Sequence, residues 1–296
     1  MDGGHPAQVD GADRRFDGRP GGAAVDARVA RAAASENFPV VVRLTPRRLK
    51  APIRAFYAFA RGADDVADDP RLPSEAKLAA LDAYADGLAG RDGAPQGVAL
   101  RAALAGHPQE ARATAAAATL LDAFRQDARG ADYPDWAALR DYCARSADPV
   151  GRFLLAVHGE GREAEAASDA LCTALQVLNH MQDLRADRDR MGRVYMPAEW
   201  LDDPARLSAP RMDPVARRAL DRALDTCDRL LADAAPLPSR IRSPSLRMQA
   251  AATLHLARRL RDRLRSGDPL AARIKPTRGD IAGAAVRSLL ALRAGR

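Results

Sequence analysis

The chain has 296 residues and a formal net charge of +7, and only 4% of its residues are aromatic. This length is enough for one domain with a sizeable core, and the positive charge suits an anionic partner. The arginines are spread along the chain with few aromatic residues among them, which argues against nucleic acid as that partner. Three cysteines without metal-type spacing, and no apolar run near the about 18 residues of a membrane span, indicate a cytoplasmic protein with neither a disulfide framework nor a spanning helix.

Residues 1–28 are rich in Gly, Asp and Arg and carry almost no periodic apolar pattern. Such a composition cannot bury enough apolar surface to order a chain, so we expect a disordered N-terminal leader. No linker divides the remaining sequence, and we expect residues 29–296 to form one domain.

Helix start and stop signals then follow one another along the chain, beginning with the N-cap and first-turn proline of Thr45-Pro46. No alternating run of β-branched residues predicts a strand. The sequence therefore predicts an all-α protein of about ten helices. The clearest of these span residues 45–69, 74–88, 108–129, 132–143, 148–159, 163–189, 213–234 and 244–265.

The first of these helices ends in four carboxylates, Asp64, Asp65, Asp68 and Asp69, directly before Pro70. Each negative charge in a last turn costs about 0.3–1 kcal/mol, and pairs four residues apart repel each other. Helical geometry places Asp64, Asp68 and Arg61 beside the apolar stripe, and the other acids further out. This unfavourable arrangement suggests a missing cation, although a solvated acidic helix end would show the same pattern.

The helix at 163–189 carries a second polar strip. Its members fall within one arc roughly 100° wide and are amides, an imidazole and carboxylates, which suit a cavity better than a solvated surface. Neighbouring arginines at 185, 188 and 190 could instead pair with these acids. The strip consists of Gln176, Asn179, His180, Asp183 and Asp187.

Two acidic helix ends in one helical chain are more informative together than apart. Oxygen ligands suit Mg²⁺, which binds through a few carboxylates together with substrate phosphates. Mg²⁺ held between the two ends would assist the departure of a diphosphate, and the apolar helices would keep bulk water from the resulting carbocation.

These motifs, in this order, resemble those of the squalene/phytoene synthase family. The resemblance rests on Arg61-x-x-Asp64-x-x-x-Asp68, on the strip from Ala174 to Asp187, on Tyr142-Cys143 with Val150-Gly151, and on Gly192-Arg193-x-Tyr195-x-Pro197, and it spans about residues 35–200. It implies the all-α isoprenoid synthase fold, a single helical bundle with a central cavity between the acidic motifs. It also implies Mg²⁺ and an isoprenoid diphosphate substrate.

Within the family, four stretches are most similar to the hydroxysqualene synthase branch of hopanoid and squalene biosynthesis. They are residues 35–40, 56–61 and 148–152, and Gln182-Asp183. That branch ionises presqualene diphosphate, rearranges the cation and captures water. Squalene and phytoene synthases usually carry Arg where this chain has Gln182, and often Ala-Gly where it has Asp148-Pro149, which favours the hydroxysqualene branch.

The resemblance also implies roles for single residues. Asp64, Asp68, Asp183 and Asp187, assisted by Asn179, would bind Mg²⁺ and are counted as catalytic together with Tyr142. Arg61, Ser35 and Asn37 would contact the diphosphate. Phe38, Tyr142, Gln176 and Tyr195 would line the cavity, although Phe38 and Tyr142 could equally be ordinary core aromatics.

Two other functions stay open at the level of the sequence. One is a head-to-head prenyl synthase that makes presqualene diphosphate, squalene or phytoene. The other is a non-catalytic assembly factor of the same fold at a membrane surface, which the intact acidic pairs disfavour. Neither interpretation requires an obligate protein partner.

The last segment, residues 276–296, has the pattern of a short basic amphipathic helix. It could attach the protein peripherally to the inner face of a membrane, into which an apolar product would pass. It could equally pack its apolar side on the bundle and leave its basic side in water.

Overall fold

The computed structural model describes residues 45–130 and 132–293, so the expected leader and Ser35, Asn37 and Phe38 lie outside the described residues. Within this part of the chain there are eleven α-helices and no β-strand, which confirms the all-α prediction. The helices are α2 (Lys50–Asp68), α3 (Ser74–Ala89), α4 (Pro95–Leu104), α5 (Glu110–Arg129), α6 (Trp136–Ser146), α7 (Asp148–Val157), α8 (Glu165–Met191), α9 (Pro214–Asp233), α10 (Leu237–Arg240), α11 (Pro244–Ser266) and α12 (Arg278–Arg293).

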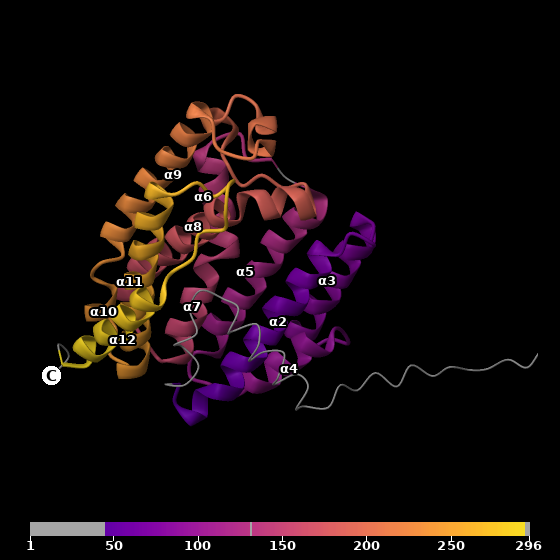
Figure 1. Cartoon of the computed structure of the whole chain (residues 1–296). Helices are drawn as coiled ribbons and strands as arrows, with labels where there is room; N and C mark the ends of the chain where they lie inside the picture. Colours follow the sequence, from indigo (N-terminus) through magenta and orange to yellow (C-terminus); the bar gives the residue numbers. More distant parts are fainter. Residues whose placement is uncertain (1–44, 131, 294–296) are drawn as a thin grey trace, which may run out of the picture.

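The helices form two groups that lie side by side (Figure 1). One group surrounds a core of buried residues from α2 to α5 and α7, and the other surrounds a larger core from α6, α8, α9 and α11. Leu154 on α7 packs against both cores. The two acidic helices, α2 and α8, therefore belong to different groups, and the seam between the groups separates them.

Helix α2 is fixed by its apolar stripe, in which Phe56, Phe59, Ala63 and Ala67 are buried. The ring of Phe56 stacks on Phe153 of α7, with centroids 3.8 Å apart. The helix ends at Asp68 because Asp69 adopts an extended backbone conformation before Pro70. Its acidic end is thus held at a fixed position by the core of its own group of helices.

Helix α8 is the longest element, and its buried residues occupy most of its circumference. It ends where Gly192 takes a left-handed conformation with φ of 66°, which glycine adopts without the strain that a Cβ would cause. This turn sends the chain back across the end of α2, so that Arg193 and Tyr195 reach the first acidic motif.

Most predicted helices occur within a few residues of their expected bounds. Helix α6 begins at Trp136 rather than at residue 132, because the Asp135 side chain caps it by accepting a hydrogen bond from the Ala138 amide at 2.8 Å. Helix α4 was not predicted at all. In the part of the chain described here, no helix is long and apolar enough to cross a bilayer.

Candidate active site

The first acidic motif lies where α2 faces the second group of helices. The side chains of Asp64 and Asp68 are 36% and 33% exposed, whereas that of Asp65 is 60% exposed. Arg61 contacts Asp64 at 3.1 Å and Asp65 at 2.8 Å. Burial, and then repulsion from Asp68, raises the pKa of Asp64 to about 7 despite the nearby guanidinium. This end of α2 therefore carries more negative charge than its surroundings stabilise.

Arg193 connects this motif to the rest of the site. Its Nη1 lies 2.5 Å from Asp68 Oδ1 and 3.4 Å from the Tyr195 hydroxyl. Its Nη2 donates to the carbonyl oxygens of Ala67 at 3.5 Å and Asp127 at 3.3 Å. One guanidinium thus joins α2, α5 and the segment after α8, and it contacts a carboxylate that the sequence assigns to metal binding.

A cluster of aromatic rings lies behind Arg193. Tyr133, Tyr142 and Tyr195 have centroids 5.4–5.7 Å apart, and His180 stacks on Tyr195 at 3.7 Å. The Tyr142 hydroxyl donates to Asp127 Oδ2 at 2.9 Å. Burial raises the pKa of Asp127 to about 6 and that of Tyr142 well above its usual value, so the phenol stays protonated at neutral pH. The cluster forms a buried set of π faces beside the Arg193 guanidinium.

The second acidic motif has an arginine partner that its own helix does not supply. Arg273, between α11 and α12, contacts Asp183 through Nε at 2.6 Å and through Nη2 at 2.9 Å. Asp187 lies 3.9 Å from the Nδ1 atom of His180. Upstream on α8, Asn179 and Gln176 are half-buried.

Two of the neighbouring arginines that could have neutralised this motif, Arg185 and Arg188, bind elsewhere. Arg185 donates to the carbonyl oxygens of Leu270 and Ala209, at 2.7 and 3.0 Å. Arg188 pairs with Asp189. The acids of α8 are therefore not an ordinary surface ion-pair series, and Arg273 is the partner that a reading of the helix alone cannot find.

The structure adds four side chains to the predicted site, namely Asp127, His180, Arg193 and Arg273. His180 and Arg193 stand in motifs that the sequence singles out, but without an assigned role. The sequence pattern could have indicated Asp127, because this acid continues the apolar stripe of Leu120, Phe124 and Ala128. The structure buries it with them. An acid at such a position requires a partner, which is Tyr142.

The donors present fit a hard cation that shares its coordination with a substrate. All are oxygens, and burial together with the negative charge of Asp68 raises the pKa of Asp64. Among the described residues no three His, Cys, Asp or Glu side chains stand close enough together to form a complete metal cage. Mg²⁺ needs only one or two carboxylates when waters and phosphate oxygens complete its shell, so two separate acidic ends suit it better than a preformed cage would.

An apolar cavity of about 90 Å³ opens between α7, α8, α10 and α11. Leu154, Leu171 and Ile241 line it together with Ala250 and the sulfur-bearing Cys172. Cys172 precedes Asp183 by eleven residues on α8, which places the cavity roughly 16 Å from the second acidic motif along the helix axis. The cavity can hold hydrocarbon beyond the polar site.

Comparison with known proteins agrees with this arrangement. The squalene/phytoene synthase family matches residues 31–280. The hydroxysqualene synthase of Rhodopseudomonas palustris is 38% identical over 81% of this chain and 82% of its own, and that of Zymomonas mobilis is 37% identical over 84% and 86%. The phytoene synthase of Mycobacterium tuberculosis is 34% identical over 65% of this chain.

Solved structures show the same fold. The squalene synthase of Alicyclobacillus acidocaldarius superposes with a TM-score of 0.67 at 32% identity, covering 81% of this chain and 93% of the other. A dehydrosqualene synthase crystallised with a ligand superposes with a TM-score of 0.77 at 20% identity, covering 91% and 97%. The architecture is the isoprenoid synthase fold. The chain belongs to the squalene/phytoene synthase family.

Proposed function

We propose that the protein is a hydroxysqualene synthase, which converts presqualene diphosphate and water into hydroxysqualene and diphosphate. The observation that carries this proposal is the identity of 36–38% to three hydroxysqualene synthases over 81–84% of this chain. The phytoene synthases match less of it, 65–66%. Gln182-Asp183 and Asp148-Pro149, which set the sequence apart from two-substrate synthases, agree with this assignment.

Diphosphate departure is the first step of the proposed reaction. Asp64 and Asp68 on α2, and Asp183 and Asp187 with Asn179 on α8, would hold Mg²⁺. Bound Mg²⁺ would neutralise the diphosphate and make it a better leaving group. Arg61 and the predicted contacts Ser35 and Asn37 bind phosphate oxygens, and we add Arg193 and Arg273 to this set because each already contacts an acid of one motif.

In the remaining steps the cation must be shielded from bulk water, and a single water molecule must then react with it. The carbon–oxygen bond to diphosphate breaks, and its electron pair leaves with the diphosphate. The rings of Tyr142 and Tyr195 stabilise the rearranging cation through their faces and exclude bulk water, with Phe38 and Gln176 lining the same space. A water oxygen then forms a bond to the cation and loses a proton to solvent or to the departed diphosphate.

The apolar cavity between α7, α8, α10 and α11 supports an isoprenoid substrate. Its lining is mostly aliphatic, and it lies beyond the polar strip of α8. A long hydrocarbon tail whose diphosphate rests at the acidic motifs would extend toward it, and burial of that tail would supply binding energy.

The alternative of a head-to-head prenyl synthase is tested by substrate choice. Purified protein with Mg²⁺ should form hydroxysqualene from presqualene diphosphate without a nicotinamide cofactor. With farnesyl diphosphate alone it should form no presqualene diphosphate, squalene or phytoene. Efficient condensation of farnesyl diphosphate would transfer the assignment to that alternative, and inertness toward both substrates would favour the non-catalytic assembly factor.

We also propose that the protein works in the cytoplasm and contacts the inner face of the membrane peripherally. The proposed product is a hydrocarbon alcohol with almost no solubility in water, so it must pass into lipid. Fractionation of cells should recover the protein in the cytosol at high salt and partly with membranes at low salt.

A further inference from the structure

Helix α12 presents apolar side chains to solvent. Ile281, Val286, Leu289 and Leu290 are 38%, 55%, 59% and 48% exposed. Only three other large apolar side chains in the described part of the chain are comparably exposed, and they lie apart on α7, on α4 and in the loop after α2. Exposed apolar side chains gathered on one helix commonly mark an interaction surface.

The side of α12 that faces the bundle is small and polar instead. Ala284 and Ser288 are buried there, and Ser288 donates a hydrogen bond to the Met248 carbonyl oxygen on α11 at 3.0 Å. Gly283 lies so close to His255 that a Cβ would stand 2.7 Å from its ring nitrogen. The sequence allowed a helix packed by its apolar side, and the structure shows the reverse orientation.

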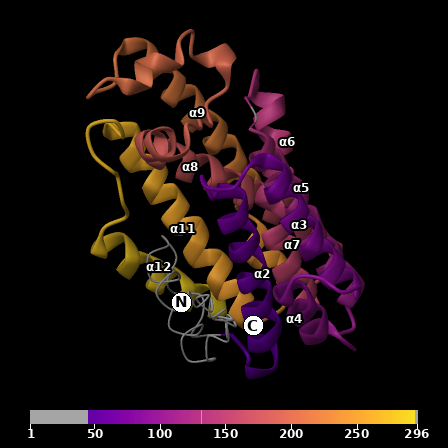
Figure 2. The ribbon, with the colours of Figure 1, turned by 90° about the vertical axis from the view of Figure 1, so that its right-hand side faces the viewer.

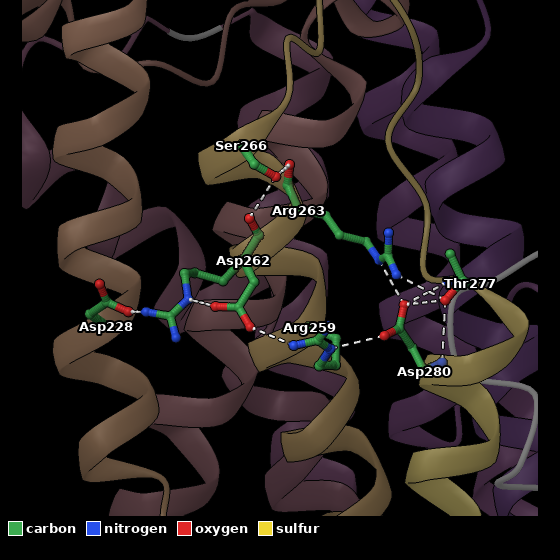
Figure 3. A network of polar contacts seen from close by, with 8 residues as sticks. Asp228, Arg259, Asp262, Arg263, Ser266, Thr277 and Asp280 are labelled. Carbon is green, nitrogen blue, oxygen red and sulfur yellow. Dashed lines mark hydrogen bonds and ion pairs between the residues drawn. The ribbon is translucent and has the colours of Figure 1, made fainter.

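An ion network around the buried carboxylate of Asp280 fixes that orientation (Figure 3). Asp280, in the first turn of α12, accepts from Arg259 at 2.9 Å and from Arg263 at 2.7 Å, both on α11. It also accepts from the amide and the hydroxyl of Thr277, while the Asp280 amide donates back to that hydroxyl, which forms a capping box. Because α12 cannot rotate without breaking these contacts, they hold its apolar side outward.

The charges around this apolar side are positive. Lys275, Arg278 and Arg287 are exposed and form no ion pair with any residue in the described ranges. The one acid of α12, Asp280, is buried and already paired. An apolar helix face with free cations and no exposed carboxylate complements an anionic lipid surface, whose headgroups attract the cations while the acyl region receives the apolar side chains.

We propose that the outer face of α12, formed by Ile281, Val286, Leu289 and Leu290 with Arg278 and Arg287, docks on anionic lipid. The same stretch of α11 connects this face to the apolar cavity. Gln249, Ala250 and Thr253 line the cavity, whereas Met248, Ala252 and Leu256 lie against α12. Docking therefore brings α11 and the cavity that it lines toward the bilayer, with α12 in between. A benefit of this placement for an apolar substrate or product rests on the proposed function. The docking itself does not rest on it.

Vesicle flotation of the full chain tests the proposal. It should float with vesicles of equal parts phosphatidylcholine and phosphatidylglycerol, and the bound fraction should fall at high salt. Val286→Ser with Leu289→Ser should lower binding by about tenfold, because two apolar anchors are lost. Leu72→Ser with Val98→Ser is the matched control, since both residues are exposed on other elements, and it should bind as the native chain does.

A second pair of variants tests the charges. Arg278→Gln with Arg287→Gln should reduce binding to the anionic vesicles and leave weak binding to pure phosphatidylcholine unchanged. Arg101→Gln with Arg222→Gln removes two exposed arginines from other helices and should have little effect. Truncation before α12 is a poorer test because it would leave Arg259 and Arg263 without Asp280. Circular dichroism and the Tm should stay native in all four variants.

Several results would overturn the proposal. Among them are failure of the native chain to float, equal binding by the α12 and control variants, and binding indifferent to anionic lipid. Light scattering that shows a dimer, disrupted by Val286→Ser with Leu289→Ser, would assign the face to a second copy instead. Because flotation requires no turnover, an inactive protein that floats would refute the proposed function alone, and an active protein that does not float would refute only the docking.

Discussion

Asp64 and Asp65 are consecutive residues of α2 but lie in different environments. Asp64 faces the second group of helices, where burial and Asp68 raise its pKa to about 7, whereas Asp65 is mostly exposed. The two side chains have the same chemistry and both contact Arg61. A comparison of variants at these positions therefore separates the effect of the site from the effect of charge at a helix end.

Asp64→Asn and Asp183→Asn should each lower kcat by about 100-fold or more, because each removes a charge that the transition state needs while preserving the shape of the side chain. Asp65→Asn should retain activity within about threefold of the native value. Mg²⁺ should raise the Tm of the native chain and of the Asp65 variant, but less or not at all for the other two. Normal turnover by either site variant would argue against the metal assignment.

Asp64 should make the metal-free protein less stable as the pH rises from about 4 to about 7. The Asp64 carboxyl has a pKa near 3.8 when unfolded and about 7 when folded. The folded state thus holds the extra proton in this window, and the contribution of Asp64 to the free energy of unfolding decreases with pH, whereas that of His158, whose pKa burial lowers to about 4, increases. In EDTA, Asp64→Asn should remove the decline that Asp64 contributes and raise the Tm at pH 8, whereas Asp65→Asn should reduce that decline only slightly, because the charge of Asp65 is a lesser cause of the raised pKa of Asp64. Equal slopes for both variants would contradict the environment described for Asp64.

The sequence identifies the residues of helical motifs better than the contacts made across helices. Asp64, Asp68, Asp183 and Asp187 are apparent because charge repeats at helical spacing. Arg193 and Arg273 lie outside helices, so no periodicity indicates what they contact. Their pairing with Asp68 and Asp183 depends on how the two groups of helices pack, which one-dimensional patterns do not contain.

Among the elements, α12 is the one whose orientation the sequence left open between two alternatives. Hydrophobic periodicity finds the helix but does not tell which side is buried, because small residues and an ion network around Asp280 can outweigh larger apolar side chains. Helix α4 was missed for a related reason. Only ten residues long, it has a weak pattern, and the close approach of Gly97 to the backbone of α3 holds it in place.

Asp280→Asn should destabilise the protein by about 1–3 kcal/mol, because it leaves Arg259 and Arg263 without their carboxylate partner. Both arginines are partly exposed, which moderates the loss. Asp262→Asn, which affects the pairs of the half-exposed Asp262 with Arg259 and Arg261 on the same network, should cost less than about 1 kcal/mol. Urea unfolding measures both values. Equal losses would mean that Asp280 does not anchor α12.

At the scale of the whole molecule, two helical cores meet at a seam that carries the site. Each acidic motif lies in a different core, and Arg193 and the helix α7 connect them. Figure 2 shows α11, from the larger group, to the left of α2. Substrate binding across the seam would join both halves, so ligand should stabilise the entire fold rather than one part.

The apolar cavity should bind the substrate tail. Ala250→Leu fills part of its about 90 Å³ and should raise KM for presqualene diphosphate by about tenfold, while the Tm changes by only a few degrees, since a void becomes occupied. Ala251→Leu on the adjacent position, which does not line the cavity, serves as the control. An unchanged KM for Ala250→Leu would place the tail elsewhere.

The central claim is that this protein ionises presqualene diphosphate and captures water. The most direct measurement is mass spectrometry of the product formed from presqualene diphosphate and Mg²⁺ in ¹⁸O-labelled water. The account predicts hydroxysqualene with one ¹⁸O atom in its hydroxyl group, absent in EDTA and from the Asp64→Asn variant. Squalene as the product, hydroxysqualene without the label, or no reaction by the native protein would contradict it.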